Sequence, residues 1–176
     1  MYKFEYCNSI GHAGEKLALA DQRWADLMWP GYTDIRKAGI DDQRRGVDLW
    51  VHRPDQPAIA VDVKTTAHGQ DKCYVERWSD ECRKRVGWTF NTSHITDYVL
   101  YIYLRTKRMR IVNYRWLREQ CIENEFRLLK SRMVLSNNGY DTITYSLTWR
   151  ELQQVLGMPY ADLKSPKTSS IQMGLF

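Results

Sequence analysis

The stretch that most constrains the fold of this 176-residue chain is residues 44–67, RRGVDLWVHRPDQPAIAVDVKTTA. Its first part, 46–53, is rich in Val, Leu and Trp, and its second part, 58–64, alternates apolar and polar side chains. The PDQP sequence between them is typical of a turn. The stretch therefore predicts two β-strands joined by a turn, with Asp62 and Lys64 on the same face of the second strand.

Three charged side chains lie in this predicted strand pair, because Asp48 stands among apolar neighbours in the first strand. Carboxylates that converge on a strand pair lose solvation energy unless another group offsets the loss. A hard divalent cation bound by oxygen ligands would do so. For a lone D-x-K sequence, the alternative is a solvent-exposed Asp62–Lys64 ion pair that contributes almost nothing to stability.

The sequences GVDL at 46–49 and VDVKT at 61–65 together resemble the PD-(D/E)XK nuclease superfamily. The sequence HAGEK at 12–16, on a predicted first helix, adds to the similarity, which covers roughly residues 11–66. The resemblance implies an α/β fold with a mixed central β-sheet flanked by helices, of the restriction-endonuclease-like type. It also implies hydrolysis of DNA phosphodiester bonds with Mg²⁺ (or Mn²⁺).

The resemblance assigns catalytic roles to Asp48, Asp62, Lys64 and Glu15, and metal ligation to Asp48, Asp62, Glu15 and the backbone carbonyl of Val63. Lys64 would orient or deprotonate the attacking water and stabilise the transition state. Glu15 falls opposite the apolar stripe of its predicted helix, residues 9–28. The alternative for Glu15 is therefore a solvated residue that favours the positive end of the helix dipole.

Basic residues near the motif and farther along the chain are candidates for contact with DNA phosphates. Together with a threonine, they are Arg44, Arg45, Thr65, Lys72, Arg83, Lys84 and Arg85. The formal net charge of +5 is compatible with a polyanionic partner but does not establish one. The alternative is that these side chains simply form solvated surface.

The remaining sequence predicts further elements of one domain over residues 1–159. A short strand is expected within 32–40, strands at 98–104, 109–112 and 142–147, and helices at 79–86 and 115–130. Thr148 and Glu151 have the spacing of a capping box at the start of a last short helix. Gly157 is expected to end that helix.

The composition changes at Tyr160, and residues 160–176 are predicted to be a flexible tail. Its end, QMGLF, resembles the bacterial sliding-clamp-binding pentapeptide, with Gln172, Met173, Leu175 and Phe176 as the contact residues. The resemblance implies that Leu175 and Phe176 fill an apolar pocket of the clamp. The alternative is that these residues fold back on the domain.

Several classes of site and location are disfavoured by the sequence. The four cysteines show no C-x-x-C spacing, so reduced, mostly buried thiols are expected instead of a zinc or iron–sulfur site. The N-terminus lacks the apolar run of a signal peptide, and no apolar run is long enough to span a membrane. A cytoplasmic location is expected.

The predicted function is a Mg²⁺-dependent deoxyribonuclease, recruited to DNA in replication, repair or recombination by a sliding clamp. Two alternatives from other classes stay open: a catalytically silent nucleic-acid-binding domain, and a clamp-binding regulatory protein on the same scaffold. Nothing in the sequence marks an oligomer interface, so a homodimer is a further open alternative.

Overall fold

The computed structural model describes residues 4–67, 71–137, 139–157, 159–163 and 172–173. The chain divides into two compact units. The first, which we call the seven-stranded unit, takes residues 3–70, 95–113 and 159–176. The second, the four-stranded unit, takes residues 1–2, 71–94 and 114–158. Residues 1–159, expected from the sequence to form one domain, are thus divided between two units. The chain passes from one unit to the other and back more than once.

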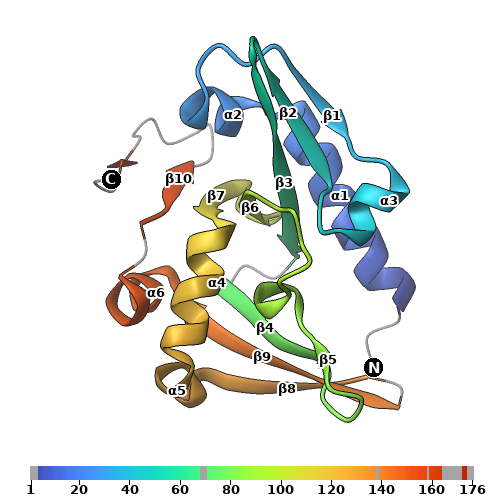
Figure 1. Cartoon of the computed structure of the whole chain (residues 1–176), viewed down its shortest axis with the longest axis vertical. Helices are drawn as coiled ribbons and strands as arrows, with labels where there is room; N and C mark the ends of the chain where they lie inside the picture. The colour runs from blue at the N-terminus through green and yellow to red at the C-terminus, as the bar shows by residue number, and fades with distance from the viewer. Residues whose placement is uncertain (1–3, 68–70, 138, 158, 164–171, 174–176) are drawn as a thin grey trace. The chain divides into compact units, whose positions relative to one another are not determined.

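A mixed β-sheet forms the centre of the seven-stranded unit (Figure 1). In spatial order its strands are β1 (Asp34–Lys37), β2 (Leu49–Arg53), β3 (Gln56–Thr66), β6 (Tyr98–Tyr103), β7 (Arg108–Asn113), β10 (Ala161–Leu163) and β11 (Gln172–Met173). Strands β3 and β6 pair in parallel, and the other neighbours pair antiparallel. The expected α/β class with a mixed central sheet flanked by helices is confirmed.

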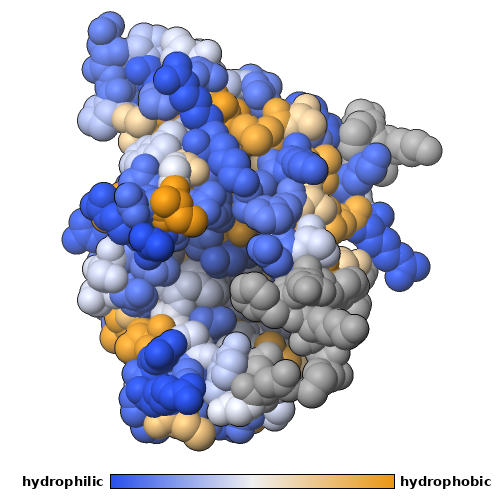
Figure 2. All heavy atoms as spheres, turned by 90° about the vertical axis from the view of Figure 1, so that its right-hand side faces the viewer, coloured by the Kyte–Doolittle hydropathy of each residue, from blue (hydrophilic) through white to orange (hydrophobic). Residues whose placement is uncertain are grey.

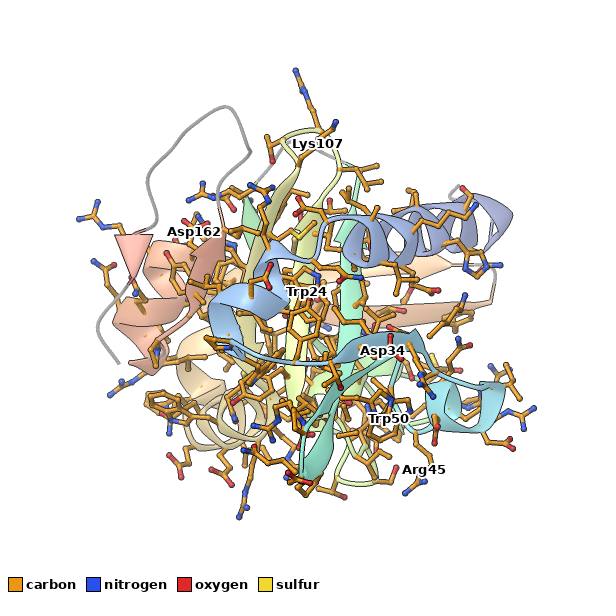
Figure 3. All side chains as sticks on the ribbon, turned by 90° about the horizontal axis from the view of Figure 1, so that it is seen from above. Trp24, Asp34, Arg45, Trp50, Lys107 and Asp162 are labelled. Carbon is orange, nitrogen blue, oxygen red and sulfur yellow. The ribbon has the colours of Figure 1, made fainter. Side chains whose placement is uncertain are left out.

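One face of this sheet is apolar and packs against helices α1 (Phe4–Ala20) and α2 (Arg23–Met28). Side chains at alternate positions of β3, including Val61 and Val63, share a buried core with Ala18 of α1 and Trp24 of α2. Trp24 points from α2 toward the strands (Figure 3) and donates a hydrogen bond from its indole N–H to the carbonyl of Ala18. The alternation of β3 therefore sends Val61 and Val63 to the helices and the residues between them to the other face.

An antiparallel sheet of β5 (Arg85–Val86), β4 (Lys72–Asp80), β9 (Tyr140–Thr148) and β8 (Arg132–Asn137), in that order, forms the four-stranded unit. Its helices are α4 (Tyr114–Glu123), α5 (Glu125–Leu128) and α6 (Trp149–Leu156). The capping box at the start of α6 is confirmed, because Thr148 accepts from the Glu151 backbone and Glu151 accepts from the Thr148 backbone. Gly157 ends α6 in the left-handed conformation with φ +62°, also as predicted.

Several predicted elements are wrong in type or length. The helix expected at 79–86 is instead the end of β4, a turn and β5. Lys84 has a φ of +52° in that turn, which a helix interior would not accommodate, so the run of basic residues lies on a hairpin. The helix expected at 9–28 breaks between α1 and α2, and the one expected at 115–130 breaks between α4 and α5. Strand β8 was not predicted.

The expectation of a flexible tail from Tyr160 fails for its first residues. Ala161–Leu163 form the buried strand β10, which pairs antiparallel with β7. Asp162 on β10 faces Arg108 and Arg110 on β7, with its Oδ1 2.8 Å from Arg108 Nε and 3.3 Å from Arg110 Nε. Asp162, labelled in Figure 3, and Arg110 are buried, and their charge contacts together with the partly exposed Arg108 hold the strand against the sheet edge.

The described cysteines match the sequence expectation in part. Cys73, Cys82 and Cys121 are free, and the first and third are buried, whereas Cys82 is exposed in the turn after β4. Among the helices described, none is long and apolar enough to cross a membrane. On the face drawn in Figure 2, hydrophilic side chains predominate and apolar side chains gather in separate patches.

Candidate active site

Asp48 is held at the start of the β2–β3 hairpin by backbone contacts on both sides. Its N–H donates to the Val61 carbonyl at 2.9 Å, and its carbonyl accepts from Ala38 N–H at 2.8 Å. Gly46, at φ +84°, supplies the left-handed turn that leads the chain into this position. The Asp48 carboxylate accepts a hydrogen bond from Val63 N–H at 2.7 Å. The hairpin register thus brings Asp48 beside the D-x-K sequence.

Asp62 and Lys64 lie on the face of β3 that points away from α1 and α2. Asp62 is only 2% exposed, and its Oδ2 lies 2.9 Å from Lys64 Nζ. That oxygen is buried and accepts no hydrogen bond, so the contact with Lys64 is a charge contact outside hydrogen-bond geometry. The solvent-exposed ion pair considered for a lone D-x-K sequence is wrong for Asp62, although a third of the Lys64 side chain is exposed.

Burial and the neighbouring carboxylate of Asp62 raise the pKa of Asp48 above its ordinary value. Desolvation is the largest cause and the charge of Asp62 the second, and together they raise the pKa of Asp48 to about 6. The hydrogen bond from Val63 N–H and the charge of Lys64 lower the pKa of Asp48 but do not cancel the increase. Two neighbouring carboxylates with little solvent around them repel each other when both are ionised, and a bound cation at neutral pH would offset that repulsion.

The two carboxylates fit a Mg²⁺ ion. Asp62 Oδ2 accepts no hydrogen bond, and the contact that a metal would have to displace there is the charge contact with Lys64 Nζ at 2.9 Å. Mg²⁺ in proteins commonly takes one or two carboxylates and keeps several waters. The described residues contain no group of three or more His, Cys, Asp or Glu side chains that could hold a metal. Asp48 and Asp62 are the two neighbouring carboxylates at this place, and the ligation of a metal by them and by the Val63 carbonyl stays a prediction.

Glu15 does not join this pair of aspartates. Its Oε2 lies 2.6 Å from Lys37 Nζ on β1, and its Oε1 lies 3.7 Å from His12 Nδ1. Lys37 shares the helix-covered face of the sheet with Ile35, whereas Asp62 points to the opposite face. The Glu15 side chain is 13% exposed, so the fully solvated alternative is also wrong, and its part in metal binding stays a prediction.

Thr65 is directed away from the aspartates as well. A Cβ built on Gly14 of α1 would lie 1.8 Å from Thr65 Oγ1, so the threonine packs directly under the helix. Its hydroxyl oxygen is buried and without a hydrogen-bond partner. The alternation of β3 therefore places Thr65 on the face opposite Lys64, and its predicted phosphate contact lacks an exposed hydroxyl.

The predicted arginines before the motif are exposed and paired with local acids. Arg44 ends the short helix α3 (Ile40–Arg44), and its Nη1 lies 3.1 Å from Asp41 Oδ1. Arg45 Nη1 lies 3.8 Å from Asp42 Oδ1 and points outward in Figure 3. Such surface pairs are weak, so both guanidinium groups can exchange their acids for a phosphate.

The other predicted basic residues belong to the four-stranded unit. Lys72 begins β4, and Arg83 Nη1 lies 2.8 Å from Asp80 Oδ2 in the turn that follows this strand. Lys84 Nζ lies 5.5 Å from the centre of the Trp78 ring, and Arg85 begins β5. All four therefore belong to a different unit from Asp48 and Asp62, and their contact with DNA stays a prediction.

Only part of the C-terminal motif is described. Gln172 and Met173 form β11, which pairs antiparallel with Asp162 and Ala161 of β10. Leu175 and Phe176 lie outside the described residues.

Tyr101 is a site candidate that the sequence did not single out. It is the register partner of Lys64 in the parallel β3–β6 pair, so both side chains emerge on the same face from neighbouring strands. Tyr101 is 3% exposed. The run YVLYIY indicated only a strand covered on both faces, and the Lys64–Tyr101 pairing depends on a parallel register that no local pattern indicates.

The fold and the site together define a class: an α/β protein with a partly buried Asp48, a buried Asp62 and an adjacent lysine on one face of a mixed sheet. Comparison with protein-family models, curated proteins and solved structures finds no match.

Proposed function

We propose that the protein is a Mg²⁺-dependent deoxyribonuclease that hydrolyses DNA phosphodiester bonds at Asp48, Asp62 and Lys64. The observation that carries the proposal is the buried Asp62 beside the partly buried Asp48, with Lys64 Nζ at 2.9 Å from Asp62 Oδ2. Two neighbouring carboxylates with little solvent around them lower the stability of a protein, and such pairs are common at functional sites such as those of metal-assisted reactions on phosphates. The resemblance of these same residues to the PD-(D/E)XK pattern supports the same reaction.

Each residue has a distinct part in the proposed reaction. Asp48 and Asp62 hold Mg²⁺, which when bound lowers the pKa of a coordinated water and offsets the charge that grows on the scissile phosphate. Val63 N–H keeps the Asp48 carboxylate in place through its 2.7 Å hydrogen bond. Lys64 orients the attacking water and stabilises the added negative charge on the phosphate. Arg44 and Arg45 bind the DNA backbone.

The test is cleavage of linear, circular and branched DNA with Mg²⁺, Mn²⁺ or EDTA. We expect metal-dependent cleavage that is lost, by roughly a hundredfold or more, in Asp62→Asn and in Lys64→Ala. Asp55→Asn is the matched control, because Asp55 lies in the turn at the other end of the same hairpin, and it should cleave normally. Equal cleavage by all variants, or none by the wild type on any substrate, would contradict the proposal.

A second candidate function is a catalytically silent nucleic-acid-binding domain. The observation that favours it is the engagement of Glu15 by Lys37, which leaves the described site with two carboxylate ligands. This function predicts DNA binding that is unchanged by EDTA and by Asp62→Asn. The binding measurement, made on the same variants by fluorescence anisotropy, separates it from the nuclease.

We also propose that the C-terminal QMGLF sequence attaches the protein to a sliding clamp. A tether to a ring on DNA raises the local concentration of a nuclease at its substrate without any base contact. The test is binding of purified bacterial sliding clamp to the full chain and to a chain that ends at Ile171. We expect binding only by the full chain, and equal binding by both would exclude the motif.

A further inference from the structure

The exposed apolar side chains of the protein are concentrated in the four-stranded unit. Within the described residues, seven of the ten exposed large apolar side chains fall between positions 122 and 140. Three of them are consecutive on β8: Met133, Val134 and Leu135, exposed by 38%, 44% and 44%. Exposed apolar residues that gather in one place are unusual on a protein surface and mark an interaction site.

Strand β8 is also an edge of its sheet. The strand order is β5-β4-β9-β8, so β9 pairs with one side of β8 and no described strand pairs with the other. An edge strand presents backbone N–H and C=O groups to any strand that can approach it. The opposite edge, β5, has only two residues, whereas β8 has six. The long apolar edge therefore lies on one side of this unit.

The usual protections of an edge strand are sparse on β8. Residues 132–136 contain no proline, and their only charged side chain is Arg132, whose Nη2 lies 3.3 Å from Glu81 Oε1. The β8–β9 register runs without a bulge from Arg132 to Asn137. A straight edge with apolar side chains on both faces accepts another strand without strain.

We propose that β8 pairs antiparallel with β8 of a second copy of this chain, across a two-fold axis at Val134. This register is self-complementary: Val134 meets its own equivalent, and Met133 of each copy meets Leu135 of the other. It also keeps like charges apart, because Arg132 of each copy lies opposite Ser136 of the other and not opposite a second arginine. The two four-stranded sheets then continue as one sheet.

The pairing extends an apolar row that already exists within the unit. Val134 is the register partner of Ile143 on β9, and Ile143 is 2% exposed. In an antiparallel pair, partners share a face, so the two Val134 side chains lie between the two Ile143 side chains. Phe126 and Leu129, exposed by 67% and 55%, precede β8 and supply further apolar surface on the same unit. This proposal does not depend on the nuclease activity.

A cysteine cross-link tests the register directly. In a background with Cys7→Ser and Cys82→Ser, Val134→Cys places two sulfurs across the axis at a Cα separation of about 4.5–5.5 Å, within the range of a disulfide. Ser136→Cys is the matched control on the same strand, because its equivalents lie about 13 Å apart in this register. We expect mild oxidation to give a cross-linked dimer with Val134→Cys and a monomer with Ser136→Cys.

Analytical ultracentrifugation of the wild type tests the assembly itself. We expect a dimer whose dissociation constant rises roughly tenfold or more in Val134→Lys, because two ammonium groups then meet on the axis. Ile40→Lys, which adds the same charge at an exposed residue of the seven-stranded unit, should leave the dimer unchanged. Three results would each overturn the proposal. The first is a wild type that is monomeric at about 100 µM, a concentration that corresponds to an association free energy of about −5.5 kcal/mol. The others are a dimer that is insensitive to Val134→Lys and equal cross-linking of both cysteine variants.

Discussion

Asp48 illustrates how a single carboxylate links folding to the proposed chemistry. Its side chain accepts one short backbone hydrogen bond, from Val63 N–H, yet desolvation and Asp62 raise its pKa to about 6. A carboxyl group whose pKa is raised by folding binds its proton more tightly in the native state. Its ionisation therefore costs stability above pH 6 and costs nothing below the unfolded pKa of 3.8.

We predict that Asp48→Asn stabilises the metal-free protein at pH 8. The native carboxylate is charged at that pH and the amide is not, so the gain in unfolding free energy approaches about 3 kcal/mol, less the weaker hydrogen bond from Val63. The gain should shrink as the pH falls from 6 toward 4. Urea unfolding in EDTA at pH 8, 6 and 4.5 measures it, with Asp55→Asn as the exposed control. A gain that is the same at every pH would show that Asp48 is not the titrating group.

At the scale of elements, the close approach of α1 to β3 depends on one glycine. A Cβ at Gly14 would lie 1.8 Å from Thr65 Oγ1 and 2.8 Å from Thr65 Cβ, whereas a Cβ at Gly11 of the same helix would meet nothing within 4 Å. Thr65 is a short, branched side chain on a central strand, so it has little freedom to withdraw. Both glycines lie within α1, but only Gly14 is required for the close packing of the helix on β3.

We predict opposite effects of the same substitution at these two positions. Gly11→Ala should raise the unfolding free energy by about 0.5–1 kcal/mol, because alanine favours the helix interior. Gly14→Ala should lower it by about 1–3 kcal/mol, because the added methyl group must push α1 away from the sheet. Thermal unfolding by circular dichroism gives both values. Stabilisation by both substitutions would mean that α1 does not pack on Thr65.

For the whole molecule, strand β10 brings residues from near the C-terminus to the edge of the seven-stranded sheet. Ala161 and Leu163 are each 8% exposed, and Asp162 is buried against Arg108 and Arg110. Burial raises the pKa of Asp162, but the hydrogen bonds and charges of the two arginines hold it below its usual value. Strand β10 thus contributes both apolar and charged contacts to the seven-stranded unit.

We predict that a chain ending at Leu163 is about as stable as the full chain, and that a chain ending at Gly157 is less stable by about 3–5 kcal/mol or more. The second truncation removes Asp162, which forms an ion pair with the buried Arg110, and uncovers the core beside β7. Urea unfolding of the three chains measures the difference. Equal stability of all three would mean that the pairing of β10 with β7 contributes nothing to stability.

Local patterns in the sequence were sufficient where the interactions are local. The period of two in β3 determined that Asp62 and Lys64 share a face, and the spacing of Thr148 and Glu151 determined the cap of α6. The D-x-K spacing and the preceding GVDL sequence also indicated the candidate site. For the shared face of Asp62 and Lys64 and for the cap of α6, the partners are a few residues apart, so the backbone geometry of one element decides the contact.

Only the tertiary structure decided the contacts that join distant segments. The hairpin register placed the Asp48 carboxylate on Val63 N–H, and the parallel β3–β6 register placed Tyr101 beside Lys64. The packing of α1 sent Glu15 to Lys37 and away from the aspartates. The pairing of β10 with β7 ordered residues whose composition is typical of a tail. Strand pairing and helix packing depend on the burial of whole faces, which no short window of sequence contains.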